Sequence, residues 1–106
     1  MKKSIFSVIA LTLNVVALFA NDEEKHNYKP SAGYVPNAAT AIKIAVAVWE
    51  PIYGVEQIAR ERPYRVLLKK DVWIVEGSLP EDLNGGIAVA EISKDSGKIL
   101  RVSHGK

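Results

Sequence analysis

Residues 37–54, NAATAIKIAVAVWEPIYG, form the longest stretch of helical periodicity after the first twenty residues of the chain. Apolar side chains recur every three or four positions and share one side of a helix, whereas Lys43 and Glu50 fall on the opposite side. Asn37 is a suitable N-cap, and Gly54 can take the backbone conformation that ends a helix. The stretch therefore predicts one long amphipathic helix with a wide buried face.

Pro51 is the residue of this stretch that disfavours a helix. Its ring removes the hydrogen bond to the carbonyl of Ala47 and clashes with that group. We therefore expect the helix to kink or restart in its last turn. Such a bend would present Trp49 and Tyr53 at the surface.

The sequence after the helix predicts strands. Residues 54–63 predict a short helical turn or a loop with Ile58 directed inward, because Pro63 disfavours a helix before it. From Tyr64 the apolar period falls to two. The predicted strands cover residues 64–69, 72–79, 87–93 and 99–103, with turns at 70–71 and 94–98 and a loop at 80–86. The fold class is therefore α+β, with one long N-terminal helix packed on a curved, antiparallel four-stranded sheet.

The alternation along the strands assigns the two faces of the sheet. The core face carries Trp73, Val75, Gly77, Leu79, Ala88, Ala90 and Ile92. Its small residues would leave room for Trp49 and Tyr53 of the helix. The opposite face carries Val72, Ile74, Ile87 and Val89, interrupted by Glu76, Glu91 and Arg101. An apolar surface rimmed by charge is typical of a site that binds another protein, and the alternative is that a second layer, a dimer mate or the N-terminal segment covers it.

Residues 1–20 have the features of a secretory signal peptide. Lys2 and Lys3 precede an apolar run, and Ala20 stands before the polar residues 21–25. We expect cleavage after Ala20 and a periplasmic protein, with an uncleaved membrane anchor as the alternative. The absence of cysteine excludes a lipid-modified lipoprotein. Residues 21–32 predict a flexible leader and residues 33–106 a single domain.

The charge of the chain argues against some partners. Two of its 14 basic residues and none of its 12 acidic residues belong to the signal peptide, so the predicted mature protein has no net charge. Nucleic acids and anionic membranes are bound by basic patches. We therefore expect neither a nucleic-acid partner nor membrane binding after cleavage.

The sequence contains no recognisable catalytic or metal-binding set. There is no cysteine nucleophile, and the two histidines are His26 in the leader and His104, which we expect at the surface near a frayed end. No histidine pair is available to bind a metal. Glu76 and Glu91 lie on adjacent predicted strands and could form a carboxylate pair for acid–base chemistry, but such residues are more typical of a solvated face. We predict no enzymatic activity, no cofactor and no metal.

Five segments follow one another between residues 41 and 106: AIKIAVAVWEPIYG, ERPY, DVWIVEGSLP, GGIAVAEISKDSGKIL and HGK. In their order and spacing they resemble the nuclear transport factor 2 fold immunity proteins of bacterial polymorphic toxin systems. The resemblance implies the cone-shaped α+β fold of cystatin-like and nuclear transport factor 2-like proteins, no catalysis, and the task of binding and neutralising a cognate toxin. Together with the signal peptide, it implies protection of the periplasm.

Aromatic and arginine side chains often dominate protein interfaces. The candidates for contact with a toxin are Trp49, Tyr53, Arg60, Arg62 and Arg101. For the two aromatic residues the alternative is packing in the core.

Two other functions remain compatible with the sequence. A small-ligand-binding module or isomerase-like enzyme of the same fold would need a carboxylate in the core beside Trp73, whereas the alternation turns Glu76 away from it. A periplasmic peptidase inhibitor or a chaperone-like domain is not distinguishable from an immunity protein by these residues. The oligomeric state is left open.

Overall fold

A computed structural model describes residues 26–79 and 85–105. The predicted signal peptide and its cleavage point lie outside these residues. The elements follow in the order α2 (Ala38–Tyr53), α3 (Val55–Arg60), β1 (Arg65–Lys69), β2 (Val72–Glu76), β3 (Ala88–Ser93) and β4 (Ile99–His104).

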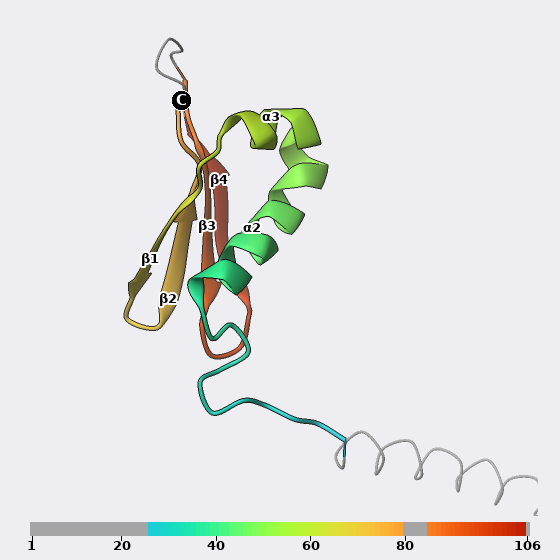
Figure 1. The fold of residues 1–106 in the computed structure, drawn as a ribbon, viewed down its shortest axis with the longest axis vertical. Helices are drawn as coiled ribbons and strands as arrows, with labels where there is room; N and C mark the ends of the chain where they lie inside the picture. The colour runs from blue at the N-terminus through green and yellow to red at the C-terminus, as the bar shows by residue number, and fades with distance from the viewer. Residues whose placement is uncertain (1–25, 80–84, 106) are drawn as a thin grey trace, which may run out of the picture.

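The four strands form one antiparallel sheet in the order β1-β2-β3-β4. Both helices lie on one side of this sheet, and the described ribbon has no helix on the other side (Figure 1). The end of the sheet near α3 also carries the C-terminus, and the two hairpin turns lie at the opposite end (Figure 1). The predicted α+β fold, a long helix packed on an open four-stranded antiparallel sheet, is therefore confirmed.

The long helix begins and ends where its sequence indicates. The side chain of Asn37 accepts hydrogen bonds from the backbone N–H and the hydroxyl of Thr40 at 2.9 and 2.8 Å. At the other end Gly54 has a φ of 97°, and its N–H donates to the carbonyl of Glu50 at 2.9 Å. The helix buries Ala41, Ala45 and Trp49 against the sheet.

Pro51 does not interrupt α2, which continues to Tyr53. The chain breaks instead at Gly54 and restarts as the short helix α3, whose Ile58 is fully buried as predicted. The expectation that a bend exposes Trp49 is wrong. Trp49 is on the buried stripe, is 0% exposed, and donates its Nε1–H to the carbonyl of Val89 at 3.3 Å. Its ring thus packs in the core between helix and sheet.

The predicted hairpins are confirmed. Lys70 and Asp71 form the two-residue turn between β1 and β2 with φ values of 50° and 61°. Positive φ values at both positions are typical of the tight turns that match the twist of the two strands they connect. Gly97 has a φ of 77° in the turn between β3 and β4, and its N–H donates to the carbonyl of Ser93 at 2.9 Å.

The assignment of the core face is correct for most positions and wrong for Leu79, and the packing expected beside Gly77 also differs. Leu79, which the alternation places in the core, is 44% exposed because β2 already ends at Glu76. Gly77 is buried, but the space beside it is filled by Glu61 and not by the helix aromatics. A Cβ added at Gly77 would lie 2.8 Å from the Cβ of Glu61. The glycine therefore permits a buried carboxylate to approach the strand.

The segment before α2 is held against the sheet. The N–H groups of Tyr34 and Val35 donate to the carbonyls of Asp95 and Lys94 at 2.9 and 3.0 Å. The carbonyl of Val35 accepts from the Nε1–H of Trp73 at 2.8 Å. Because Lys29 also pairs with Asp95 at 2.6 Å, contacts with the domain begin before residue 33. Within the described part of the chain, no helix has the length and apolar character needed to cross a bilayer.

Candidate partner-binding site

The side of the sheet that has no helix over it in the described residues is formed by every second residue of the strands. The register aligns one row across all four strands as Arg65, Glu76, Val89 and Ser103, and the next row as Leu67, Ile74, Glu91 and Arg101. Since the alternate residues form the core, these rows lie on the face opposite the helices. We call this surface the outer face.

Two ion pairs cross the outer face. Arg65 lies 3.5 Å from Glu76, and Arg101 lies 3.1 Å from Glu91. Glu76 and Glu91 are diagonal neighbours in the register, since Glu76 is opposite Val89 and Glu91 is opposite Ile74. Each carboxylate thus has an arginine partner, which agrees with a solvated face more than with an acid–base pair.

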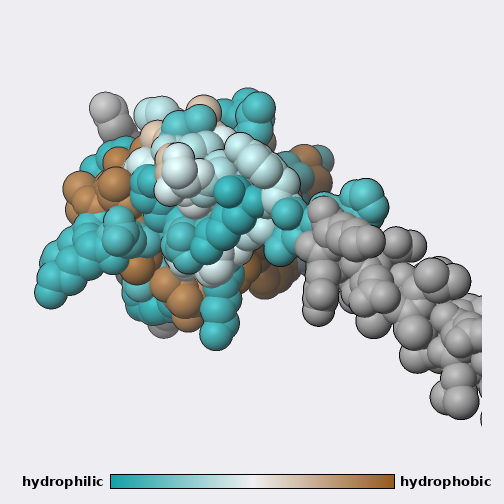
Figure 2. Space-filling view, turned by 90° about the horizontal axis from the view of Figure 1, so that it is seen from below, coloured by the Kyte–Doolittle hydropathy of each residue, from teal (hydrophilic) through white to brown (hydrophobic). Residues whose placement is uncertain are grey.

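A groove with a volume of about 490 Å³ lies along the end of the outer face near the C-terminus. We call it the outer groove. Its apolar lining is Leu79, Ile87 and Val89, and its polar lining includes Arg65, Glu76, Arg101 and Ser103. It combines exposed apolar side chains with charged groups able to select a partner. Figure 2 views the molecule from the opposite end, that of the hairpin turns, and shows hydrophobic patches separated by hydrophilic side chains there.

The structure does not bring the five predicted contact residues together. Trp49 lies in the core, and Tyr53 is partly buried with its ring centroid 5.0 Å from that of His104. Arg60 and Arg62 are exposed at the end of α3 and just after it. Among the five, Arg101 alone lines the outer groove.

Arg65 lines the groove with Arg101 and is absent from the contact residues predicted from the sequence. The sequence does indicate that Arg65 is exposed, because it alternates with Val66 in a predicted strand. The missing information was the register, which places Arg65 in the same row as Glu76 and Val89.

A second cluster surrounds Glu61, a residue that no sequence motif singles out. Glu61 follows α3 and is 1% exposed. Its Oε1 accepts from the backbone N–H of Ala88 at 2.7 Å, and its Oε2 accepts from Nε2 of Gln57 at 2.9 Å. The Nε2 of His104 lies 2.8 Å from the same Oε2. We call Glu61, Gln57 and His104 the Glu61 cluster.

The charge of Glu61 is stabilised in spite of its burial. Burial raises the pKa of a carboxylate, but hydrogen bonds from Gln57, from the N–H of Ala88 and from His104, with the charge of that imidazole, outweigh the burial. The pKa of Glu61 is therefore lowered from its ordinary value of 4.5.

His104 is not the frayed surface residue that the sequence predicts. It is the last residue of β4, is paired with Ala88 across the sheet, and has a side chain only 22% exposed. The N–H of Gly105 donates to the carbonyl of Ile87 at 3.2 Å and fixes the strand end. The Nδ1 of His104 lies 3.2 Å from the carbonyl of Gly105, so both ring nitrogens face oxygen atoms.

The Glu61 cluster supports a structural role. The carboxylate of Glu61 is engaged by three donors, and the outer groove is lined by other side chains. The cluster joins α3 to β3 and β4 in a chain that has no cysteine and therefore no disulfide to make such a connection.

This geometry predicts a specific acid sensitivity. Because the pKa of Glu61 is lowered by folding, its ionised form contributes stability fully above pH 4.5, and this contribution is lost as the pH falls below 4.5 through the lowered pKa. Urea unfolding of the wild type and of Glu61→Gln at pH 7, 4.5 and 3 measures it. We expect the stability difference between the two proteins to shrink toward pH 3. An equal difference at all three pH values would contradict this role of the charge.

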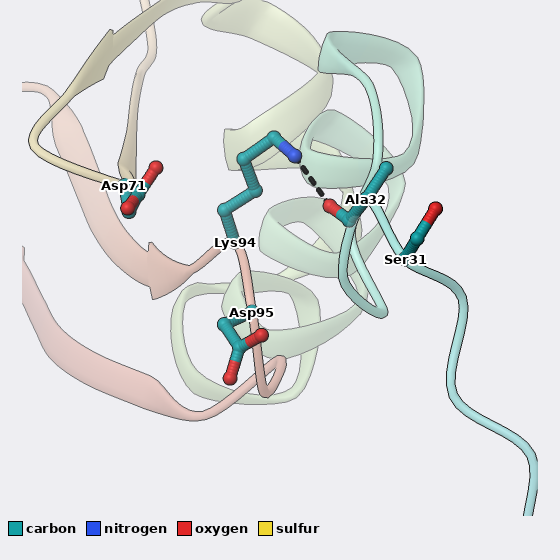
Figure 3. A pocket seen from close by; sticks show the side chains of 5 residues that line it. All are labelled: Ser31, Ala32, Asp71, Lys94 and Asp95. Carbon is teal, nitrogen blue, oxygen red and sulfur yellow. Dashed lines mark hydrogen bonds between the residues drawn. The ribbon is translucent and has the colours of Figure 1, made fainter.

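A small polar pocket of about 150 Å³ lies between the N-terminal segment and the β3–β4 turn. Figure 3 shows Lys94 extended toward the carbonyl of Ala32, to which its Nζ donates. Asp95 of the same turn pairs with Lys29. The pocket's charged groups thus hold the N-terminal segment in place. Across the described ranges, no three His, Asp or Glu side chains are grouped so as to hold a metal ion.

Comparisons with known proteins identify the family. A model of the family described as NTF2 fold immunity protein matches residues 40–106. Among curated proteins, the uncharacterized protein YhhH of Escherichia coli (strain K12) is 36% identical over an alignment covering 68% of this chain and 58% of YhhH.

The uncharacterized protein YbbC of the same strain is 29% identical over 97% of both chains. The matched part of the chain thus spans less than two thirds of YhhH and nearly all of YbbC. No solved structure matches the chain. Because the family model covers more than half of the residues, the chain belongs to the NTF2 fold immunity protein family.

Proposed function

We propose that this protein binds a cognate protein toxin through the outer groove and neutralises it in the periplasm without catalysis. The observation that carries the proposal is that the outer face, which exposes apolar side chains among charged ones, has no helix over it in the described structure, in a chain of an immunity-protein family. The periplasmic location rests on the predicted signal peptide, residues 1–20.

The lining of the outer groove fits a protein partner. Ile87 and Val89 are partly exposed, and Leu79 has 44% of its surface in solvent. Binding would remove these apolar groups from water. Arg65 and Arg101 sit beside them and would orient a partner through charge-assisted hydrogen bonds.

The five residues predicted from the sequence contribute unequally to this proposal. Arg101 stays as a contact residue, and Arg60 and Arg62 stay as exposed contacts outside the groove. Tyr53 packs on His104 and Trp49 is buried in the core. We therefore expect these two residues to stabilise the fold and not to contact the toxin.

Capture and rescue test the proposal together. Tagged protein, residues 21–106, is used to capture partners from periplasmic and secreted extracts, and the bound proteins are identified by mass spectrometry. We expect a partner with a toxin domain whose lethality is relieved when this protein is co-expressed. A captured toxin that kills equally well with and without this protein would contradict the proposal.

The outer groove makes a prediction for toxin affinity. Arg101→Glu should weaken toxin binding about thirtyfold, as expected when an arginine at an interface is lost and replaced by the opposite charge. Isothermal titration calorimetry on the purified pair measures the dissociation constant. Lys43→Glu is the matched control, because Lys43 is exposed on α2, which lies on the side of the sheet away from the outer face. Equal affinities of the two variants would place the toxin elsewhere.

A further inference from the structure

Among the strands that the structure describes, β1 is an edge of the sheet, since β2 is its one neighbour in the strand order. The two-residue turn makes Lys69 and Val72 a hydrogen-bonded pair, and hydrogen-bonded and open pairs alternate along an antiparallel ladder. Leu67 and Arg65 therefore direct their backbone groups toward β2. Val66 and Leu68 direct theirs away from the sheet, where they are available to another strand.

The edge is strongly basic. Residues 62–70, RPYRVLLKK, contain four basic residues and no acidic residue. Arg65 has Glu76 within 3.5 Å, whereas Arg62, Lys69 and Lys70 are exposed and make no ion pair with the described residues. A second copy of the chain would bring the same charges together, so like-charge repulsion opposes pairing of two β1 edges.

The edge also exposes apolar side chains and a hollow. Leu67 is 60% exposed and Leu68 is 42% exposed. A hollow of about 310 Å³, lined by Arg65, Val66, Leu67, Ile74 and Glu76, lies beside Leu67 on the outer face. A strand added beside β1 places every second side chain on this face, so its acidic residues would meet Arg65 and Lys69 there, while its alternate apolar residues would lie beside Leu68 on the other face.

We propose that β1 binds an extended, acidic segment of the toxin as a fifth strand of the sheet. This inference rests on the proposed function and names the chemistry of the partner. Backbone hydrogen bonds to Val66 and Leu68 would pair the toxin segment with β1. The four basic residues of the stretch 62–70 would favour a segment that carries acidic side chains. A strand fits the edge better than a nucleic acid does, because the unpaired groups are backbone amides and carbonyls beside exposed leucines.

A peptide probe tests the edge without the toxin. The probe is an eight-residue peptide of alternating glutamate and valine, added to the ¹⁵N-labelled protein while amide signals are followed by NMR. We expect saturable shifts centred on β1 and at least tenfold slower hydrogen exchange at the amides of Val66 and Leu68. The same peptide with N-methyl groups on alternate residues should lose this effect. Shifts that are absent, or unchanged by N-methylation, would overturn the proposal, as would stronger binding of a DNA oligonucleotide to the same residues.

Variants separate the backbone contribution from the charge. Leu68→Pro removes an amide that points away from β2, and proline is tolerated at such a position of an edge strand. It should abolish peptide binding. Arg62→Glu with Lys69→Glu should weaken binding at least tenfold, whereas Lys43→Glu with Lys98→Glu changes the net charge equally at exposed sites on α2 and the β3–β4 turn. Equal losses from both double variants would contradict a local charge effect.

The outcome for β1 is distinguishable from the outcome for toxin binding. If the toxin binds the wild type and Leu68→Pro equally well, the edge inference fails while the proposed function stands. If the wild type binds no toxin, the proposed function fails whatever the peptide does. If Leu68→Pro lowers the affinity for both toxin and peptide while its amide spectrum stays native outside β1, both are supported.

Discussion

Replacing Glu61 by alanine is expected to lower the free energy of unfolding by about 3 kcal/mol. This is the cost expected when one member of a buried, hydrogen-bonded ionic pair is removed and the other members stay buried. The substitution leaves the N–H of Ala88, the amide of Gln57 and the imidazole of His104 without the carboxylate that they contact. It also leaves a void beside Gly77. Chemical denaturation at pH 7 measures the loss.

Two variants decide whether the Glu61 cluster is the cause. Glu56→Ala removes an exposed carboxylate from the preceding helix and should change stability by less than about 0.5 kcal/mol. Glu61→Gln keeps an acceptor for Ala88 and should be less destabilising than alanine. If Glu61→Ala proved no more destabilising than Glu56→Ala, the cluster would not be a stabilising junction.

Replacing Trp49 by alanine is expected to cost about 4 kcal/mol, within the range found for large aromatic residues removed from cores. Trp49 is fully buried on α2, its ring lies 5.8 Å from that of Tyr64, and its indole N–H is bonded to β3. Small domains are stabilised by about 5–15 kcal/mol in total. The variant should therefore be close to unfolding at room temperature.

Ile52→Ala is the matched control, because Ile52 lies on the same helix with 58% of its surface exposed. It should keep the melting temperature within a few degrees of the wild type. Thermal unfolding followed by circular dichroism compares the two proteins. A Trp49→Ala protein as stable as Ile52→Ala would mean that the indole is not part of the core.

The elements of the fold could be predicted from the sequence because each depends on local patterns. The stripe of apolar residues in 37–54 and the capping residues Asn37 and Gly54 determine α2. The change to alternating apolar residues at Tyr64 determines the hairpins. The effect of Pro51 could not be predicted in the same way, because the proline lies on an exposed side of the last turn, where the helix tolerates it and the break falls at Gly54.

The Glu61 cluster could not be predicted because its members are far apart along the chain. Glu61 and His104 are separated by 43 positions, and the charged run ARERPY around Glu61 locally indicates a solvated turn. The burial of Glu61 follows from the way that α3 returns to the sheet at Gly77, which lacks a side chain. Register likewise decides that Arg65 and Arg101 share the outer groove, and no local pattern contains that information.

The two faces of the sheet are expected to have different tasks. The inner face is filled by α2, α3 and the Glu61 cluster, so substitutions there should act through stability. The outer face and the β1 edge carry exposed apolar and charged groups, so substitutions there should act through binding. This separation allows binding to be tested with variants that stay folded.

Protection of growth tests neutralisation through the outer groove in living cells. A strain expressing the captured toxin in its periplasm is supplied with the wild type, Arg101→Glu or Lys43→Glu at equal levels, and survival is counted. We expect the wild type and Lys43→Glu to protect, and Arg101→Glu to protect at least tenfold less. Full protection by Arg101→Glu, or none by the wild type, would contradict neutralisation of a toxin through the outer groove.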